Sequence, residues 1–210
     1  MRIKGFKDTI EWYDQNAEEY SRKVYETVPL DSIKKFISYL PSNPFVLESG
    51  CGPGRESKAF SEMGVKTLGV DFSQGLLDVA RQRNPNVEYI HANFLELPFD
   101  DSTFDGVWAH ASLVHLDTIE EVGKALSEFH RVLKGGGWVY ISVKEQLGKE
   151  KVAVVSDTLS KHERFFRYYT PQELVDLLEG SGFKIVYTGR PADLHGRNEI
   201  RWIEVMGRAL

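Results

Sequence analysis

Three glycines crowd into five positions directly after a short apolar run, in the stretch "VLESGCGPGRESK" of residues 46–58. The apolar run predicts a buried strand, and the residues after the glycines predict a helix. Glycine has no Cβ, so a ligand can lie against the backbone of such a turn, and the first amides of the following helix are available to it. The stretch therefore favours an open α/β sheet with a ligand site at the carboxyl end of its first strand.

Apolar runs alternate with segments of helical period along most of the chain, which is typical of a parallel α/β sheet. Strands are expected at residues 45–49, 66–71, 87–92, 106–111, 138–144, 183–188 and 200–206. Helices are expected at residues 8–27, 33–40, 55–63, 75–83, 118–133 and 170–179. The segment 190–198 is too short for a crossover helix, so the last strand should run antiparallel to its predecessor. We therefore predict a Rossmann-like, doubly wound α/β fold with a seven-stranded, mostly parallel sheet, the last strand antiparallel, and N-terminal helices as a cap.

A chain of 210 residues fits one domain with a sizeable core, so we expect a single domain over residues 1–210. Its parts would be a helical cap, a ligand-binding core, an insertion that is a candidate lid or acceptor site, and a C-terminal helix with a strand pair. The corresponding ranges are 1–42, 43–145, 146–169 and 170–210. The insertion shows no clean period, and a connection of that length in a compact domain is usually functional.

Charge and cysteine content exclude several classes of function. Lys and Arg number 26 against 31 Asp and Glu, a net charge of -5 that argues against general binding to nucleic acid or to an anionic membrane. The one cysteine, Cys51, can form neither an internal disulfide nor a thiol cluster for a metal, and no metal site is expected. The charged N-terminus lacks the apolar core of a signal peptide, so a soluble, cytoplasmic protein is expected.

The spacing of the glycines distinguishes between cofactors. A dinucleotide fingerprint needs a third glycine where Arg55 stands, so an NAD-dependent oxidoreductase is disfavoured. Asp71 follows the second expected strand, about twenty residues on, where a carboxylate can accept hydrogen bonds from two ribose hydroxyls. The alternatives are structural: a tight turn at the glycines, and a helix cap at Asp71.

Five stretches in the same order resemble the class I S-adenosylmethionine-dependent methyltransferases. They are "VLESGCGPG", "GVDFSQGLLDVAR", "IHANFLELPFDDSTFDGVWAHASLVHL", "HRVLKGGGWVYISVK" and "YYTPQELVDLLEGSGFKIVYTGR", and they cover roughly residues 45–190. The resemblance implies S-adenosyl-L-methionine as the cofactor and S-adenosyl-L-homocysteine as its product. In that family the glycine loop holds the methionine part, the acid after the second strand holds the ribose, and residues after the third strand frame the adenine.

The resemblance implies a set of cofactor residues. Gly50, Cys51, Gly52, Gly54 and Arg55 would form the loop, Asp71 would bind the ribose, Phe72, Asn93 and Phe94 would frame the adenine, and Tyr13, Tyr20, Glu48, Ala109 and His110 would complete the site. Two residues depart from the family pattern. Glu48 stands where Asp is usual and is one methylene longer. Asn93 replaces a frequent Asp, but its amide oxygen can still accept from an adenine amino group.

Methyl transfer is a direct displacement in which the protein mainly aligns the nucleophile, so an obligatory catalytic residue need not exist. If the acceptor loses a proton, a base near neutrality helps, and His115 and His110 follow or end the fourth expected strand. Both are candidates for catalysis. The alternatives are a wall of the cofactor pocket or a structural histidine.

Cationic and aromatic side chains gather in the insertion and the tail. Lys144, Arg164, Tyr168 and Arg197 are candidate acceptor ligands, and His162, Arg167, Tyr169, Arg190, Arg201 and Trp202 lie near them in sequence. Such a cluster could bind the carboxylate or phosphate of a small acceptor. A solvated charged surface is the alternative.

The leading hypothesis is therefore an enzyme that methylates a small molecule, with no nucleic acid or membrane partner. A noncatalytic S-adenosylmethionine-binding sensor or partner subunit would keep the same cofactor residues, and a methyltransferase acting on RNA or protein is a further alternative. The acceptor, the methylated atom and the oligomeric state stay open.

Overall fold

The computed structural model describes residues 5–156 and 163–210. One sheet is formed by β1 Phe45–Ser49, β2 Lys66–Asp71, β3 Glu88–His91, β4 Phe104–His110, β5 Leu133–Lys144, β8 Phe183–Gly189 and β9 Trp202–Ala209. The helices are α1 Phe6–Val24, α2 Leu30–Ile37, α3 Arg55–Glu62, α4 Gln74–Arg83, α5 Ile119–Val132 and α6 Pro171–Gly180, with a short 3-10 helix, η1 Leu113–His115. Two further strands, β6 Val152–Ser156 and β7 Glu163–Arg167, form a separate pair.

The sheet has the strand order β3-β2-β1-β4-β5-β9-β8. The pairs β1–β2, β2–β3, β1–β4 and β4–β5 are parallel, whereas β9 is antiparallel to both of its neighbours. The order reverses at β1, which places a topological switch point between β1 and β4. The predicted doubly wound, seven-stranded sheet with an antiparallel last strand is confirmed.

Helices cover both faces of the sheet because alternate strand residues point to opposite sides. On one face, Val46 and Trp108 of the strands pack with Phe36 of α2 and Phe60 of α3. On the other face the adjacent strand positions, including Leu47 and Val107, join a larger core with α5 and α6. The apolar stripe predicted for α5 is buried there, with Val122, Leu126 and Phe129 fully enclosed.

The predicted start of one strand was wrong, and one strand pair was not predicted. β5 begins at Leu133, directly after α5. Phe104 of β4 pairs with Leu133 and Gly106 pairs with Trp138, so residues 134–137 of β5 form a bulge between these two pairs. Gly136 takes a φ of +76° there, which glycine tolerates. The insertion 146–169 contains the antiparallel β6–β7 pair, whose short apolar runs carry too little periodicity to be told from loop. Residues 1–4 of the expected cap and residues 157–162 of the insertion lie outside the described residues, and so does the candidate His162.

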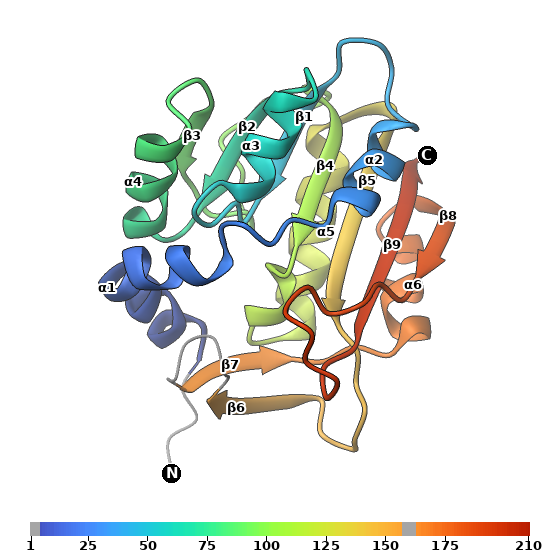
Figure 1. The fold of residues 1–210 in the computed structure, drawn as a ribbon. Helices are drawn as coiled ribbons and strands as arrows, with labels where there is room; N and C mark the ends of the chain where they lie inside the picture. The colour runs from blue at the N-terminus through green and yellow to red at the C-terminus, as the bar shows by residue number, and fades with distance from the viewer. Residues whose placement is uncertain (1–4, 157–162) are drawn as a thin grey trace.

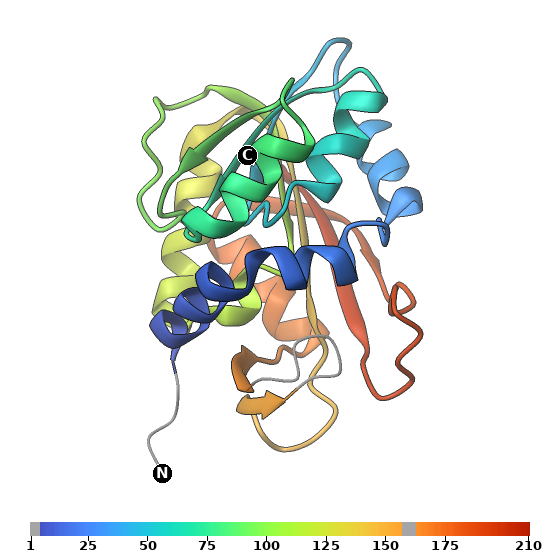
Figure 2. The same ribbon diagram turned by 60° about the vertical axis from the view of Figure 1, so that its left-hand side comes forward.

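The cap and the β6–β7 pair lie at the same end of the sheet. In Figure 1 the arrow of β5 points down toward this end, where α1, β6 and β7 gather with the segment between β8 and β9. Figure 2 shows α1 crossing this end beside α4, against which it packs through Ala17 and Leu76. The fold thus surrounds the carboxyl ends of the central strands.

Candidate functional site

The glycine loop joins β1 to α3 with its backbone in the left-handed region. Gly50 and Gly52 have φ of +74° and +53°. A Cβ on Gly50 would lie 2.3 Å from the Cβ of Ser112, whereas a Cβ on Gly52 would meet nothing within 4 Å. Gly50 is therefore required by close packing, while Gly52 presents open backbone to a ligand.

The predicted acid meets this loop directly. One carboxylate oxygen of Asp71 accepts a hydrogen bond from the Gly52 amide at 2.8 Å, and the other accepts from the Ser73 amide at 2.9 Å. Burial raises the pKa of Asp71, and these amide hydrogen bonds partly oppose that rise. The two motifs that are nineteen residues apart in sequence thus form one unit in the structure.

A cleft lies over this unit. Ten predicted cofactor residues line it: Gly50, Cys51, Gly52 and Arg55 of the loop, Asp71, Phe72, Phe94 and His110 at strand ends, and Tyr13 and Tyr20 of α1. Ser112 also lines the cleft, and its buried hydroxyl has no hydrogen-bond partner within the described part of the chain. The cleft therefore combines backbone that no side chain covers, a carboxylate, aromatic side chains and a hydroxyl group available for a hydrogen bond.

Four other predicted cofactor residues lie outside that lining. Asn93 uses its side-chain oxygen to accept from the Leu95 amide at 2.7 Å. The carbonyl of Gly54 accepts from Asn84, and Ala109 is fully buried in β4. Their contact with a cofactor stays a prediction.

Glu48, the fourth, lies beneath the loop with 2% of its surface exposed. Its carboxyl group accepts a hydrogen bond from the Ser57 hydroxyl. Burial, reinforced by the charge of Glu56, raises the pKa of Glu48 well above its usual range.

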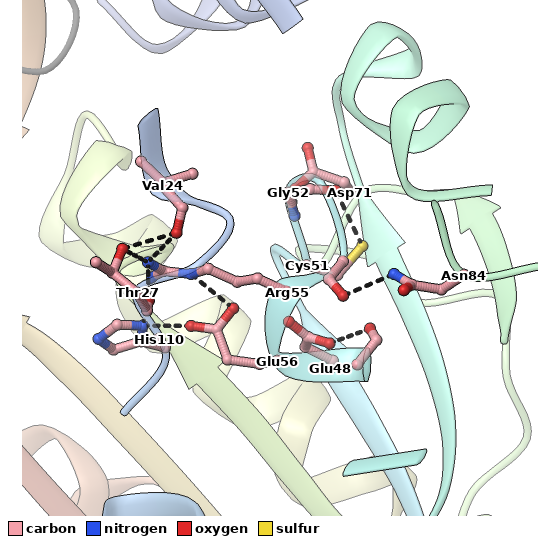
Figure 3. Close-up of polar contacts among 12 residues, drawn as sticks. Val24, Thr27, Glu48, Cys51, Gly52, Arg55, Glu56, Asp71, Asn84 and His110 are labelled. Carbon is pink, nitrogen blue, oxygen red and sulfur yellow. Dashed lines mark hydrogen bonds and ion pairs between the residues drawn. The ribbon is translucent and has the colours of Figure 1, made fainter. Parts of the chain in front are cut away.

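Arg55, Glu56 and His110 form a polar cluster at the edge of the cleft (Figure 3). The Arg55 guanidinium donates to the Thr27 carbonyl at 2.7 Å and to Glu56 at 2.9 Å. His110 Nδ1 lies 2.8 Å from Glu56 Oε1 and 3.1 Å from an Arg55 nitrogen. Arg55 therefore connects the segment after α1 to the end of β4.

Glu56 was not among the site residues predicted from the sequence. Burial disfavours its charge, but the Arg55 guanidinium and the His110 N–H lower the pKa of Glu56 to about 2. An acid in the first turn of a helix is ordinarily explained by the helix dipole, so nothing local connects Glu56 to a histidine 54 positions away.

His115 has a different environment. Its Nδ1 lies 2.8 Å from the Phe165 carbonyl and its Nε2 lies 3.3 Å from the Tyr13 hydroxyl. A carbonyl only accepts, so Nδ1 carries the proton and Nε2 accepts from Tyr13. The same tyrosine hydroxyl accepts from Arg164. Both ring nitrogens of His115 are thus engaged in tying α1 to β7.

A second cavity adjoins the cleft. The two share a wall formed by Tyr13, Tyr20, Val24, Arg55, His110, Ala111 and His115. The candidate acceptor residues Lys144, Arg164 and Arg197 line this second cavity. Tyr168 lies instead on a neighbouring cavity that Lys144 also lines.

Arg197 is held rigidly in the second cavity. Its Nε and one terminal nitrogen donate to the Asp193 carboxylate at 3.0 and 2.7 Å, and Trp202 Nε1 donates to the same carboxylate at 2.9 Å. Burial disfavours the Asp193 charge, but the hydrogen bonds from Arg197 and Trp202 lower the pKa of Asp193 below its usual range. The other terminal nitrogen of Arg197 is buried without a hydrogen-bond partner in the described residues.

No helix in residues 5–156 and 163–210 has the length and apolar character needed to cross a membrane.

Comparison with known proteins gives one consistent result. Residues 47–141 match the family model described as a methyltransferase domain. A demethylmenaquinone methyltransferase of Clavibacter sepedonicus is 38% identical over 99 residues, which cover 46% of this chain and 39% of the relative. A malonyl-[acyl-carrier protein] O-methyltransferase of Buchnera aphidicola is 37% identical over 129 residues, which cover 60% of this chain and 49% of the relative. The matches thus span half or less of these relatives' own lengths.

The fold is also found among solved structures. The 1,6-didemethyltoxoflavin-N1-methyltransferase of Burkholderia thailandensis, solved with 1,6-didemethyltoxoflavin and S-adenosylhomocysteine, superposes with a TM-score of 0.73. The alignment covers 97% of this chain and 86% of that one at 23% identity. At this identity the likeness concerns the fold.

Proposed function

Because the chain belongs to the class I S-adenosylmethionine-dependent methyltransferases, we propose that it transfers a methyl group from S-adenosylmethionine to a small-molecule acceptor by direct displacement. The observation that carries this proposal is the pair of adjoining cavities with a shared wall. One cavity lies over the glycine loop and Asp71, and the other lies among cationic side chains. Two ligands could thus meet at His110, as a displacement reaction requires.

The cleft residues fit the cofactor. Asp71 would accept hydrogen bonds from the ribose hydroxyls, Gly52 offers backbone without a side chain in the way, and the Ser112 hydroxyl lacks a partner within the described residues. Phe72 and Phe94 pack edge to face at 5.6 Å between ring centres and would frame the adenine. When bound, S-adenosylmethionine supplies a methyl group made electrophilic by its sulfonium sulfur.

The cap residues would exclude water from the reacting atoms. Tyr13 and Tyr20 pack against each other with ring centres 5.0 Å apart, and both lie on the shared wall. Aromatic faces attract cations, so these rings suit the positively charged end of the cofactor.

We further propose that the acceptor carries an anionic group. Lys144, Arg164 and Arg197 line the second cavity. Among the described residues that line it, Asp193 is the one with a carboxylate. On a chain with a net charge of -5 this local excess of cations favours a carboxylate or phosphate. By their names the relatives act on chemically different acceptors, which include demethylmenaquinone, malonyl-[acyl-carrier protein] and 1,6-didemethyltoxoflavin, so they do not choose one for this chain.

Calorimetry followed by a product assay tests the proposal. The protein is titrated with S-adenosylmethionine, S-adenosylhomocysteine and, as a control, NADH. It is then incubated with S-adenosylmethionine and a panel of small acceptors, in which each carboxylic or phosphoric acid is paired with its neutral ester, and S-adenosylhomocysteine is measured.

We expect binding of both adenosyl compounds, none of NADH, and turnover of an acid but not of its ester. Absence of adenosyl binding would refute the proposal. Binding without turnover on any acceptor would instead favour a sensor, and turnover of neutral acceptors alone would contradict the anionic group.

A further inference from the structure

His110 and Glu56 form a buried pair where the lining of the cleft meets that of the second cavity. Their side chains are 10% and 5% exposed, and His110 Nδ1 lies 2.8 Å from Glu56 Oε1. His110 lines both cavities. The pair thus lies where an acceptor and the cofactor would meet.

Hydrogen-bond chemistry fixes the tautomer of His110. The Arg55 guanidinium, which lies 2.9 Å from the other Glu56 oxygen, favours the ionised form of that carboxyl group. An ionised carboxylate only accepts, and a guanidinium only donates. If Nδ1 accepted a hydrogen bond from Arg55, its lone pair would face the carboxylate oxygen of Glu56 at 2.8 Å and the two would repel each other. Nδ1 therefore carries the proton and donates a hydrogen bond to Glu56.

The basic nitrogen of His110 is therefore Nε2. Within the described residues no side chain or carbonyl forms a hydrogen bond with this atom, whereas both nitrogens of His115 are engaged. His110 rather than His115 has the arrangement of a base: one nitrogen fixed by a carboxylate, the other carrying a lone pair.

We propose that His110 is the general base of the reaction, that Glu56 is its positioning residue, and that the acceptor accordingly presents a neutral O–H or N–H group. This inference rests on the proposed methyl transfer. The acceptor heteroatom forms a bond to the methyl carbon, the bond from that carbon to sulfur breaks with its electron pair left on sulfur, and the acceptor proton goes to His110 Nε2. Acceptors that have no proton to lose, such as thioethers and tertiary amines, are excluded as preferred substrates.

Other charged groups line the two cavities together with His110. They are Arg55 and Glu56 of α3, Asp71 of β2, Lys144 of β5, Arg164 of β7, and Asp193 with Arg197 between β8 and β9. Glu56 and Arg55 are the ones within hydrogen-bond distance of the ring.

The tautomer is measured without any acceptor, by long-range nitrogen–proton NMR of the imidazoles at a pH where they are neutral. His110 is assigned from the signals lost in His110→Asn. We expect the Nδ1–H form in the wild-type protein and a population of the Nε2–H form in Glu56→Gln. Glu62→Gln, an exposed acid on the same helix, is the matched control and should leave the signals unchanged. An Nε2–H form in the wild-type protein would overturn the proposal without the need for any variant.

Kinetics with the acceptor that the panel identifies complete the test. His110→Asn should lower kcat about 100-fold or more. Glu56→Gln should lower kcat, because His110 loses the carboxylate that fixes its tautomer. An unchanged kcat in Glu56→Gln, or preferred turnover of a thioether, would refute the assignment. Failure of S-adenosylmethionine to bind in calorimetry would refute the proposed function separately from the tautomer result.

Discussion

The carboxylate of Asp14 in α1 lies 2.7 Å from the hydroxyl of Ser73, two residues beyond Asp71. The same carboxylate oxygen accepts from the Gly75 amide at 2.9 Å, and the Ser73 hydroxyl accepts from the Leu76 amide at 3.1 Å. This arrangement joins the cap to the first turn of α4, directly beside the carboxylate proposed to bind ribose. The position of the aromatic wall therefore depends on Asp14.

Asp14→Ala should loosen the cap. The change removes two hydrogen bonds to the start of α4, which we expect to cost about 1–3 kcal/mol of unfolding free energy. Amide hydrogen exchange in residues 6–24 should become faster, and the Kd for S-adenosylhomocysteine should rise about tenfold. Asp8→Ala, an exposed acid on the same helix, is the control. Equal exchange rates in the two variants would show that the Asp14 contacts do not hold the helix.

Gly50→Ala and Gly52→Ala should differ in stability. Both positions have positive φ, so alanine at either one should lower the free energy of unfolding by about 1–2 kcal/mol, because an L-residue is strained in the left-handed region. Only the alanine at position 50 would also clash, because its Cβ would lie 2.3 Å from Ser112 Cβ. Chemical denaturation should give a clearly larger loss for Gly50→Ala. Similar losses in the two variants would mean that Ser112 moves aside freely.

Asp71→Asn should destabilise the glycine loop. An asparagine side chain has one acceptor oxygen, so either the Gly52 or the Ser73 amide would face an NH2 group, at a cost of about 1–3 kcal/mol. Calorimetry should also show weaker binding of S-adenosylhomocysteine than in the control Asp78→Asn, an exposed change on α4. Retained affinity would remove Asp71 from the proposed ribose site.

The contribution of Glu56 to stability should depend on pH. Its pKa is lowered from 4.5 to about 2 in the folded protein, so the stabilisation is present above about pH 4.5 and is lost as pH falls toward 2. The shift corresponds to about 3 kcal/mol. Urea unfolding of Glu56→Gln should therefore show its largest deficit near pH 7 and a smaller one at pH 3.5. Glu62→Gln should show no such pH dependence, and a constant deficit for Glu56→Gln would contradict the assigned shift.

The order of strands and helices could be predicted from the sequence because it depends on local patterns. Apolar runs, the capping box at Thr118 and Glu121 and the proline at residue 171 all act within a few positions, and the structure places helix starts at each. The β6–β7 pair was missed because it is stabilised by pairing across the insertion, which a short apolar run does not reveal.

The site was predictable in part for the same reason. Gly50 and Gly52 indicate a backbone conformation that glycine tolerates more easily than other residues, and Asp71 follows a clearly predicted strand. The glycine loop and the acid were therefore both predicted. Asp193 was missed: its carboxylate is held by Trp202 nine positions on, and the segment between them has no period.

The sequence by itself determined the sheet, the glycine turn and the acid beside it, because periodicity, turn residues and spacing act over short stretches of chain. Only the tertiary structure decided that His110 pairs with Glu56, that His115 is tied to Tyr13 and Phe165, and that Asp14 holds the cap. These contacts join residues 50 to 102 positions apart. Which nitrogen of a histidine stays basic depends on the partner that packing brings to the other one, and packing between distant elements leaves no local pattern in the sequence.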